Sequence, residues 1–330
     1  MAKPKVFISR LIPEEGLSML REAADADVWE DPLPPPYDKL LERTRDVEGI
    51  LSLLTDRIDA GLMDSSPRLR VISNMAVGYD NVDIAAATER GIPVGNTPGA
   101  LTDTTADFAF ALLMAAARRL QEGVDYVRAG RWLAWGPRLL AGVDVHGATL
   151  GIIGFGRIGQ AVARRSAGFG MRVLYNDPRR CPELEKSMNV AYADLDTLLR
   201  ESDFITLHAE LNETTRHLLN LEAFGKMKRG AIVVNTGRGA MIDQRALSEA
   251  LAFGRIGGAA LDVTDPEPIP MDSPLLDLPN CIVVPHMASA SVATRGRMAR
   301  MAAGNLLAGL RGERLPTCVN PEAYRKRPRG

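Results

Sequence analysis

Arg238, Glu267 and His286 each follow a short apolar run of the kind that forms a buried strand. The runs AIVVNT (231–236), GGAALDV (257–263) and CIVVP (281–285) come one after another along the chain. Because ligands of open α/β sheets bind beyond the carboxyl ends of the strands, we expect these side chains to converge there. A histidine transfers protons near neutral pH, a carboxylate stabilises its charged form, and an arginine grips a carboxylate with two hydrogen bonds. The set predicts proton transfer at the oxygen of a carbon that exchanges a hydride.

Each of these residues also has an ordinary explanation. Most arginines are solvated, many histidines after strands bind only backbone, and acids beside prolines usually belong to loops. The segment LDVTDPEPIP (261–270) holds three acids, and their positions separate them. Asp262 still belongs to the strand end and should face a cofactor, whereas Asp265 should lie in solvent. Glu267 sits where the chain can turn back toward His286, so we predict Glu267 as the histidine's partner.

A dinucleotide fingerprint strengthens this interpretation. The segment TLGIIGFGRIGQAVARR (149–165) reads as a strand, then Gly154, Gly156 and Gly159, then a helix. The first glycine allows the tight turn, the second lets the backbone approach a pyrophosphate, and the third lets helix and strand pack closely. The N-terminus of the helix then offers free N–H groups to the phosphates. A turn needed only for packing is the weaker alternative.

The next apolar run, RVLYND (172–177), ends at Asp177, 18 residues after Gly159. A carboxylate there can accept hydrogen bonds from both ribose hydroxyls and would repel a 2′-phosphate. The sequence therefore predicts NAD as cofactor, with NADH preferred over NADPH. Arg179 and Arg180 follow closely and could soften that preference, so NADP stays possible. His208 ends the run FITLH (204–208) and could line the cofactor cleft.

The elements that must position these residues alternate between strand-like and helix-like stretches, which indicates an α/β protein. A first series of strand-like runs is KVFIS, ADVWE, GILSLL, RVISN and IPVGN, and a second series of six begins near residue 148. Six runs are enough for a six-stranded parallel sheet. The Ala- and Leu-rich stretch 101–130 predicts a long helix, and its broad apolar surface predicts burial against something else. A last helix is predicted near 291–311.

Composition excludes several classes of function. The chain has 330 residues and a net charge of −1, so nothing in its charge favours nucleic acid or membrane as a partner. The three cysteines are few, odd in number and widely spaced, which favours a reducing compartment, and no metal-ligand spacing is present. The N-terminus lacks the apolar core of a signal peptide, and no apolar run is long enough to span a bilayer. We expect a cytoplasmic protein.

Over essentially its whole length the chain resembles the D-2-hydroxyacid dehydrogenase family, and within it the glyoxylate/hydroxypyruvate reductases. The resemblance rests on the motifs GIIGFGRIGQAVA, VLYNDP, NTGRG, LDVTDPEP, PHMASAS, NMAVGYDNVD, NTPGALTDTTAD and RWLAWGP. It implies two Rossmann-like domains. One is a doubly wound parallel-sheet dinucleotide-binding domain at 100–289, which includes the long dimerisation helix. The other is a discontinuous flavodoxin-like substrate domain made of 1–99 and 290–330.

The resemblance also implies roles for individual residues. His286 would be the acid/base, Glu267 its partner and Arg238 the clamp on the substrate carboxylate. Besides Arg238, the implied substrate-binding residues are Leu53, the backbone N–H groups of Val77 and Gly78, Ser289, and Trp135 reaching a neighbouring subunit of a homodimer. The implied cofactor-binding residues, besides the three glycines and Asp177, are Thr104, Arg157, Ile158, His208, Thr236, Gly237, Arg238, Asp262, His286 and Ala288.

The implied function is NAD(P)H-dependent reduction of a small 2-oxoacid, glyoxylate or hydroxypyruvate. Other acids of the same class compete: 2-ketogluconate, phosphohydroxypyruvate and branched 2-oxoacids. A nucleotide-sensing binding scaffold is the alternative from another class, and fast turnover of a 2-oxoacid would exclude it. Two residues depart from the family pattern, which usually has glycine where Ala288 stands and proline where Glu210 stands. Plain dimer packing is an equal alternative for Trp135.

Overall fold

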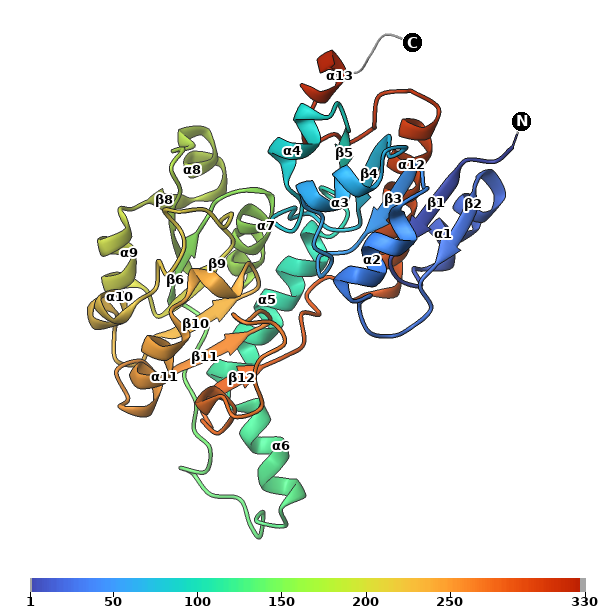
Figure 1. The fold of residues 1–330 in the computed structure, drawn as a ribbon. Coiled ribbons are helices and arrows are strands. Elements are labelled where there is room, and N and C mark those ends of the chain that lie inside the picture. The colour runs from blue at the N-terminus through green and yellow to red at the C-terminus, as the bar shows by residue number, and fades with distance from the viewer. Residues whose placement is uncertain (1, 327–330) are drawn as a thin grey trace. The chain divides into compact units, whose positions relative to one another are not determined.

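The structure is a computed structural model that describes residues 2–326. The chain divides into two compact units (Figure 1). One unit, here called the first unit, runs to Leu101 and resumes at Ala290, and the other, the second unit, comprises Thr102–Ser289. Each unit is built around its own parallel sheet, which confirms the predicted α/β class with two Rossmann-like sheets.

The sheet of the first unit has five parallel strands in the order β2-β1-β3-β4-β5, the flavodoxin-like arrangement. The strands are β1 (Lys5–Ile8), β2 (Asp25–Val28), β3 (Gly49–Ser52), β4 (Val71–Asn74) and β5 (Val94–Gly95). Helices α1 (Glu14–Ala23) and α12 (Val292–Leu310) pack on one face, and α2 (Tyr37–Thr44), α3 (Ala60–Ser65) and α4 (Ile84–Glu89) pack on the other. A short helix, α13 (Ala323–Lys326), follows α12. The C-terminal helix thus completes the core that the N-terminal segment begins.

The sheet of the second unit has seven parallel strands in the order β12-β11-β10-β9-β6-β7-β8. They are β6 (Thr149–Ile153), β7 (Arg172–Asn176), β8 (Val190–Tyr192), β9 (Phe204–Leu207), β10 (Ile232–Asn235), β11 (Gly258–Leu261) and β12 (Cys281–Val283). The strand order reverses beside β6, where a doubly wound sheet binds its ligand. The six-strand prediction missed β8. This strand is only three residues long, pairs only with β7 at the sheet edge and is mostly exposed, so it has no apolar run to reveal it.

Helices cover both faces of this second sheet. One face carries α5 (Thr102–Ala117) and α7 (Arg157–Ser166), and the other carries α9 (Leu195–Glu201), α10 (Leu221–Lys226) and α11 (Gln244–Ala252). Helix α8 (Pro182–Met188) lies between β7 and β8 in the sequence. The central strands β9, β10 and β11 are buried on both faces, which explains why their predicted runs are continuously apolar rather than alternating.

The long helix predicted at 101–130 is two helices. Helix α5 ends at Ala117, and α6 (Leu120–Arg128) begins after Arg119, whose φ of 52° is left-handed. The carbonyl of Ala117 accepts the N–H of Val143 at 2.9 Å, so a distant segment satisfies the end of α5. Helix propensity alone could not reveal this break, because arginine is a good helix former.

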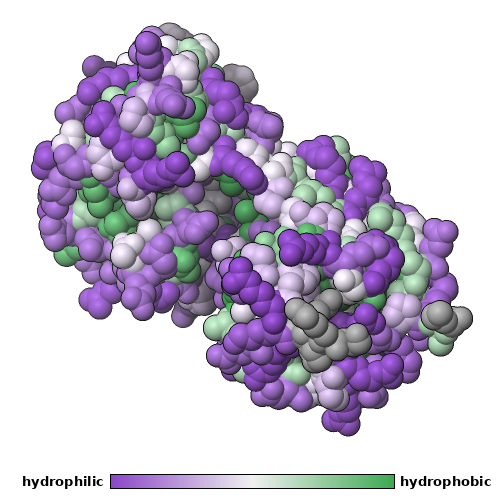
Figure 2. Space-filling view, turned by 90° about the horizontal axis from the view of Figure 1, so that it is seen from above, coloured by the Kyte–Doolittle hydropathy of each residue, from purple (hydrophilic) through white to green (hydrophobic). Residues whose placement is uncertain are grey.

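Helix α6 buries none of its residues, and the segment after it carries exposed tryptophans. Figure 1 shows this helix projecting away from the sheet of its unit. On the face drawn in Figure 2, hydrophilic residues predominate and hydrophobic ones form only small groups. Among residues 2–326, no helix is long and apolar enough to cross a membrane.

Candidate active site

The three residues predicted to do chemistry follow three neighbouring strands. Arg238 comes three residues after β10, Glu267 six residues after β11, and His286 three residues after β12. The strands lie side by side in the order β12-β11-β10, and their last residues are in register. The second sheet therefore brings all three residues to one edge.

The structure pairs His286 with Glu267. The Nδ1 atom of His286 lies 2.6 Å from Oε1 of Glu267, and the side chains are 24% and 33% exposed. A carboxylate on Nδ1 sets the orientation and tautomer of the ring and stabilises its charged form. It leaves Nε2, the other ring nitrogen, for proton exchange with a ligand.

Asp262 holds the backbone that carries His286. Its side chain is buried, with Oδ1 accepting the N–H of Met287 at 2.6 Å and Oδ2 accepting the N–H of Ala288 at 2.9 Å. Its carbonyl accepts the N–H of His286 at 2.9 Å. Burial raises the pKa of Asp262, although the two N–H donors act in the opposite direction. The chain itself thus uses both carboxylate oxygens, and a contact of Asp262 with the cofactor stays a prediction.

His286 needs this support because its φ of 49° lies in the left-handed region. A residue with a Cβ atom rarely adopts that conformation, and surrounding bonds must hold it there. The three hydrogen bonds that Asp262 accepts from the N–H groups of residues 286–288 supply that restraint. The sequence did not predict this role, although an aspartate that directly follows a buried strand was a usable signal.

The turn that carries Arg238 is held by Asn235, a fully buried residue at the end of β10. The Nδ2 atom of Asn235 donates to the carbonyl of Arg238 at 2.9 Å, and its Oδ1 accepts the N–H of Gly237 at 3.0 Å. Gly239 lets this turn pack against the segment after β11, because a Cβ there would lie 2.0 Å from the backbone of Thr264. Asn235 is a second residue that sequence reasoning missed.

Asp265 lies apart from this arrangement. It is exposed, as expected, and its Oδ2 lies 3.5 Å from Nη2 of Arg216. The His286 contact therefore goes to Glu267 and not to Asp265.

The glycine fingerprint connects β6 to α7, as its spacing predicts. Gly154 has a φ of 90°, and a Cβ there would lie 2.3 Å from the nitrogen of Ala209. A Cβ at Gly159 would lie 2.2 Å from the carbonyl oxygen of Gly154. At Gly156 the space is open, which suits close approach of a phosphate to the backbone at the N-terminus of α7. The turn therefore fits a dinucleotide.

Asp177 follows β7 directly and reaches back to the fingerprint. Its Oδ2 accepts the N–H of Phe155 at 2.8 Å, and its Oδ1 accepts the N–H of Arg179 at 2.8 Å. Arg180 is engaged elsewhere: its guanidinium pairs with Glu185 at 2.8 and 2.9 Å, which lowers the pKa of Glu185 to about 2. The carboxylate of Asp177 is thus beside the pyrophosphate turn, and Arg180 is tied to another acid.

His208 lies between two threonines, with Nε2 2.9 Å from Oγ1 of Thr206 and Nδ1 3.4 Å from Oγ1 of Thr236. Burial lowers the pKa of His208 to about 3, so its ring is neutral at physiological pH. A neutral ring can line a cofactor site but cannot supply a proton there. Other predicted cofactor residues lie in the first turns of helices, namely Thr104 in α5 and Arg157 and Ile158 in α7.

The predicted substrate residues of the first unit follow its own strands. Leu53 comes directly after β3, and Val77 and Gly78 come three and four residues after β4. Ser289 closes the second unit and is buried, as is Ala288. Trp135 lies in the segment after α6, and 82% of it is exposed.

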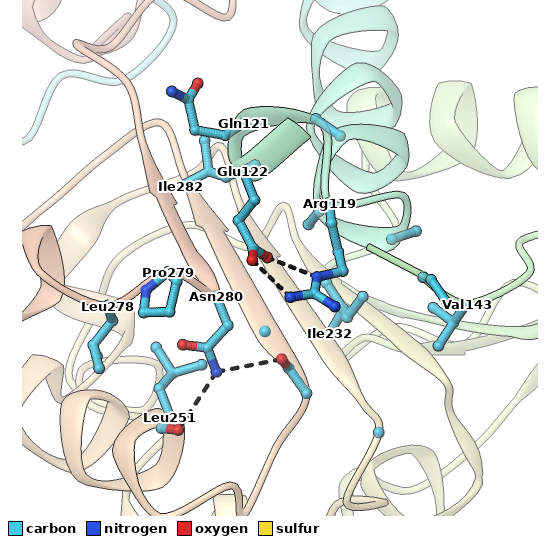
Figure 3. A pocket seen from close by; sticks show the side chains of 18 of the residues that line it. Arg119, Gln121, Glu122, Val143, Ile232, Leu251, Leu278, Pro279, Asn280 and Ile282 are labelled. Atoms are coloured by element: carbon cyan, nitrogen blue, oxygen red, sulfur yellow. Dashed lines mark hydrogen bonds and ion pairs between the residues drawn. The ribbon is translucent and has the colours of Figure 1, made fainter. Parts of the chain in front are cut away.

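A pocket of about 520 Å³ lies at the opposite end of the second sheet (Figure 3). Its walls include Ile232 and Gly258, which begin β10 and β11, and the ion pair between Arg119 and Glu122. None of the predicted catalytic or cofactor residues lines it. The candidate active site is therefore at the carboxyl edge, and this pocket is separate from it.

Comparisons with known proteins agree with this geometry. The NAD binding domain of the D-isomer specific 2-hydroxyacid dehydrogenases matches residues 110–288. A glyoxylate reductase of Korarchaeum cryptofilum is 54% identical over 329 residues, 99% of each chain, and one of Thermococcus kodakarensis is 48% identical over 332 residues, 99% of each chain.

Solved structures are similar too. A protein of Thermus thermophilus has a TM-score of 0.90 and 47% identity, covering 96% of this chain and 99% of that one. An NADPH-dependent glyoxylate/hydroxypyruvate reductase of Sinorhizobium meliloti, in complex with NADP and malonate, has a TM-score of 0.88 and 32% identity, with both chains covered completely.

Proposed function

The chain belongs to the D-isomer specific 2-hydroxyacid dehydrogenase family, and from that premise we propose that it reduces glyoxylate or hydroxypyruvate with NADH. The protein is an NAD(P)-dependent enzyme of this family; the acid, the preferred cofactor and the residue roles are the proposal. The observation that supports this proposal most is the 2.6 Å contact between Nδ1 of His286 and Oε1 of Glu267. These residues follow β12 and β11, and β11 lies next to β10, the strand that precedes Arg238.

In the proposed reaction, a nicotinamide cofactor held on the glycine turn would supply the hydride that the carbonyl carbon of the 2-oxoacid accepts. His286 donates its Nε2 proton to the carbonyl oxygen, which becomes the hydroxyl of the product. Glu267 stabilises the charged ring before the transfer and keeps it oriented afterwards. Arg238 binds the substrate carboxylate and polarises the carbonyl. We propose that Leu53, Ser289 and the N–H groups of Val77 and Gly78 also bind the substrate.

The cofactor would bind on the turn of Gly154, Gly156 and Gly159, with Asp177 on the adenosine ribose. The open space at Gly156 and the position of Asp177 beside Phe155 support this assignment. Because Asp177 repels a 2′-phosphate and Arg180 is paired with Glu185, we propose that NADH is preferred over NADPH. The Sinorhizobium meliloti relative is NADPH-dependent, so the preference needs its own test.

That test compares kcat/KM for NADH and NADPH in the wild type and in Asp177→Ser. We expect the wild type to favour NADH and the variant to gain use of NADPH relative to NADH. Equal efficiency of the wild type with both cofactors would refute the role of Asp177 and point to Arg179.

The substrate proposal is tested by a panel of 2-oxoacids with NADH, followed by loss of nicotinamide absorbance. We expect glyoxylate and hydroxypyruvate to give higher kcat/KM than 2-ketogluconate, phosphohydroxypyruvate and branched acids. No turnover with any 2-oxoacid would refute the proposed function.

We further propose a homodimer assembled through α5, α6 and the segment that carries Trp135. Leu120, Val124 and Val127 are exposed apolar residues on α6, a helix with no buried residue, which supports burial by a second copy. Sedimentation at micromolar concentration should show a dimer, and a monomer would contradict the proposal. Trp135→Ala should lower activity if its indole reaches the active site of the neighbouring subunit, whereas full activity would leave it a packing residue.

Because the three cysteines are unpaired, we also propose a cytoplasmic location.

A further inference from the structure

Two adjacent backbone N–H groups follow β4 in the first unit, those of Val77 and Gly78. Within residues 2–326, neither has a hydrogen-bond acceptor. Both residues are partly exposed, so these donors can reach a ligand. Paired backbone N–H groups suit an anion when their direction is set in advance. The carbonyls of the same peptides set that direction.

The carbonyl of each of these peptides accepts a hydrogen bond from the segment that follows β5. The carbonyl of Ala76, in the peptide that carries the N–H of Val77, accepts the N–H of Thr97 at 2.8 Å. The carbonyl of Val77, in the peptide that carries the N–H of Gly78, accepts Nδ2 of Asn96 at 2.8 Å. A trans peptide is planar, and its C=O and N–H point in opposite directions. Tying both carbonyls to residues 96–97 therefore directs both N–H groups away from that segment.

Asn96 is itself held in place by α12 and the chain after it. Its carbonyl accepts Nδ2 of Asn305 at 3.0 Å and Oγ1 of Thr317 at 2.6 Å. Asn305 is fully buried, and it packs so closely that a Cβ at Gly95 would lie 2.8 Å from its side chain. The backbone of Asn96 is thus anchored independently of its side chain, which is free to serve Val77.

A second amide network holds the other end of the turn. Nδ2 of Asn74, a fully buried residue, donates to the carbonyl of Gly78 at 3.0 Å and to Oδ1 of Asn81 at 3.0 Å. Nδ2 of Asn81 donates in turn to the carbonyls of Leu53 and Asp56 at 3.0 and 2.9 Å. The turn after β4 is therefore locked to the turn after β3, which carries Leu53.

From this geometry we infer that Asn96 is a positioning residue for an anion site formed by the N–H groups of Val77 and Gly78, with a carboxylate as the ligand. The inference rests on the proposed function for the identity of the carboxylate, that of a 2-oxoacid. Asn96 does not touch the substrate. It acts through the carbonyl of Val77, whose peptide loses its restraint when the Nδ2 donor is removed. The Gly78 N–H then points at the ligand in only a fraction of the molecules, which weakens binding.

The test is Asn96→Ala, which removes the donor without adding charge and leaves the anchored backbone intact. We expect KM for glyoxylate and the inhibition constant of oxamate, an unreactive carboxylate, to rise together by about tenfold, as loss of one positioned donor predicts. The dissociation constant of NADH, measured by nicotinamide fluorescence, should stay at the wild-type value, and kcat should change less than KM. Asn96→Asp should raise KM further, because it places a carboxylate against the Val77 carbonyl.

Asn220→Ala is the matched control. Asn220 caps α10 in the second unit by accepting the N–H of Ala223, so its loss destabilises the fold without touching the proposed anion site. It should lower Tm and leave KM and oxamate inhibition unchanged. If Asn96→Ala lowers Tm but keeps the wild-type KM and oxamate inhibition, Asn96 is only structural and the inference is wrong.

Oxamate binding to the NADH complex, measured by calorimetry, separates the two claims because it needs no turnover. Weaker oxamate binding in Asn96→Ala, in a protein whose wild type reduces no 2-oxoacid, would support the anion site and refute the proposed function. Turnover of glyoxylate by the wild type, with equal oxamate affinity in wild type and Asn96→Ala, would support the proposed function and refute the role of Asn96. Failure of the wild type to bind oxamate at all would overturn the inference.

Discussion

Asp56 and Asp262 are buried aspartates that follow a strand, one in each unit, and they organise their surroundings differently. Burial raises the pKa of both, because taking a carboxylate out of water disfavours its ionised form. Asp262 accepts hydrogen bonds with both carboxylate oxygens, and each oxygen accepts one N–H of the turn after β12. Asp56 accepts hydrogen bonds with Oδ2 alone, from the N–H of Leu53 at 2.7 Å and from the hydroxyl of Ser9.

The two aspartates therefore differ in whether their second carboxylate oxygen accepts a hydrogen bond. Within the described chain Oδ1 of Asp56 accepts no hydrogen bond, although Nη2 of Arg10 lies 3.8 Å away. An asparagine could therefore replace Asp56 by presenting its single oxygen to Leu53 and Ser9. The same replacement at Asp262 must set an NH₂ group against a backbone N–H. An ionised carboxylate is thus required on the turn that carries His286, whereas an amide would suffice on the turn that carries Leu53.

The largest effect should come from His286→Ala. This change removes the imidazole carried by the turn after β12, the turn that Asp262 holds in place. We expect kcat to fall by about 100-fold or more, as for loss of a general acid. The NADH dissociation constant should change little, because the glycine turn and Asp177 are untouched. Steady-state kinetics and NADH titration check this. A variant that keeps about a tenth of the wild-type kcat would exclude His286 as the proton donor.

Asp262→Asn should come next. One N–H of residues 287–288 loses its acceptor and faces a donor, at a cost of about 1–3 kcal/mol in the free energy of unfolding. Because His286 then loses a restraint on its left-handed backbone, kcat should also fall, by about tenfold or more. Denaturant unfolding and kcat at one pH are the measurements. Wild-type values for both would break the distinction between the two aspartates.

Glu267→Gln should have a smaller effect on kcat than Asp262→Asn. The carboxylate 2.6 Å from Nδ1 orients the His286 ring and pairs with its charged form, and glutamine keeps the size of the side chain but loses its charge. We expect kcat to fall and the dissociation constant of NADH to stay at the wild-type value. Asp265→Asn is the control, because Asp265 is exposed and pairs with Arg216. A lower kcat in Asp265→Asn, with the wild-type kcat in Glu267→Gln, would show that the wrong carboxylate was chosen.

The smallest effect should come from Asp56→Asn. The pKa of Asp56 is raised in the folded protein, so its contribution to stability is fully present below the unfolded pKa and is lost as pH rises through the folded pKa. Asparagine does not ionise and escapes this loss. The stability of Asp56→Asn relative to wild type should therefore increase from about pH 4 to about pH 7, the range above the ordinary aspartate pKa. Denaturant midpoints at the two pH values check this, and a decrease would mean that the ionised form is needed after all.

Local patterns were sufficient for much of this protein. The apolar runs predicted five strands of the first unit and six of the second, because most of these parallel strands are buried on both faces and leave an unbroken apolar run. The glycine spacing predicted the turn between β6 and α7, since only glycine fits at Gly154 and Gly159. The order of Arg238, Glu267 and His286 after successive strands predicted one shared edge, because the carboxyl ends of parallel strands meet there.

Short or interrupted elements left no such pattern. Strand β8 is three residues long and mostly exposed, and the break between α5 and α6 depends on a bond from Val143 to Ala117. Both are set by neighbours that are distant in the sequence, so a local window does not contain the cause.

By itself, then, the sequence determined which chemical groups stand at the strand ends, because residue type and hydrophobic period are local properties. Only the tertiary structure decided how those groups are held. Asp262 accepts a hydrogen bond from the N–H of Met287, 25 residues away in the sequence, and Asn96 donates one to the carbonyl of Val77, 19 residues away. Such bonds depend on which strands become neighbours and on which carbonyls and N–H groups then face each other. Hydrogen-bond direction between distant segments follows from the packed sheet, and no run of adjacent residues encodes it.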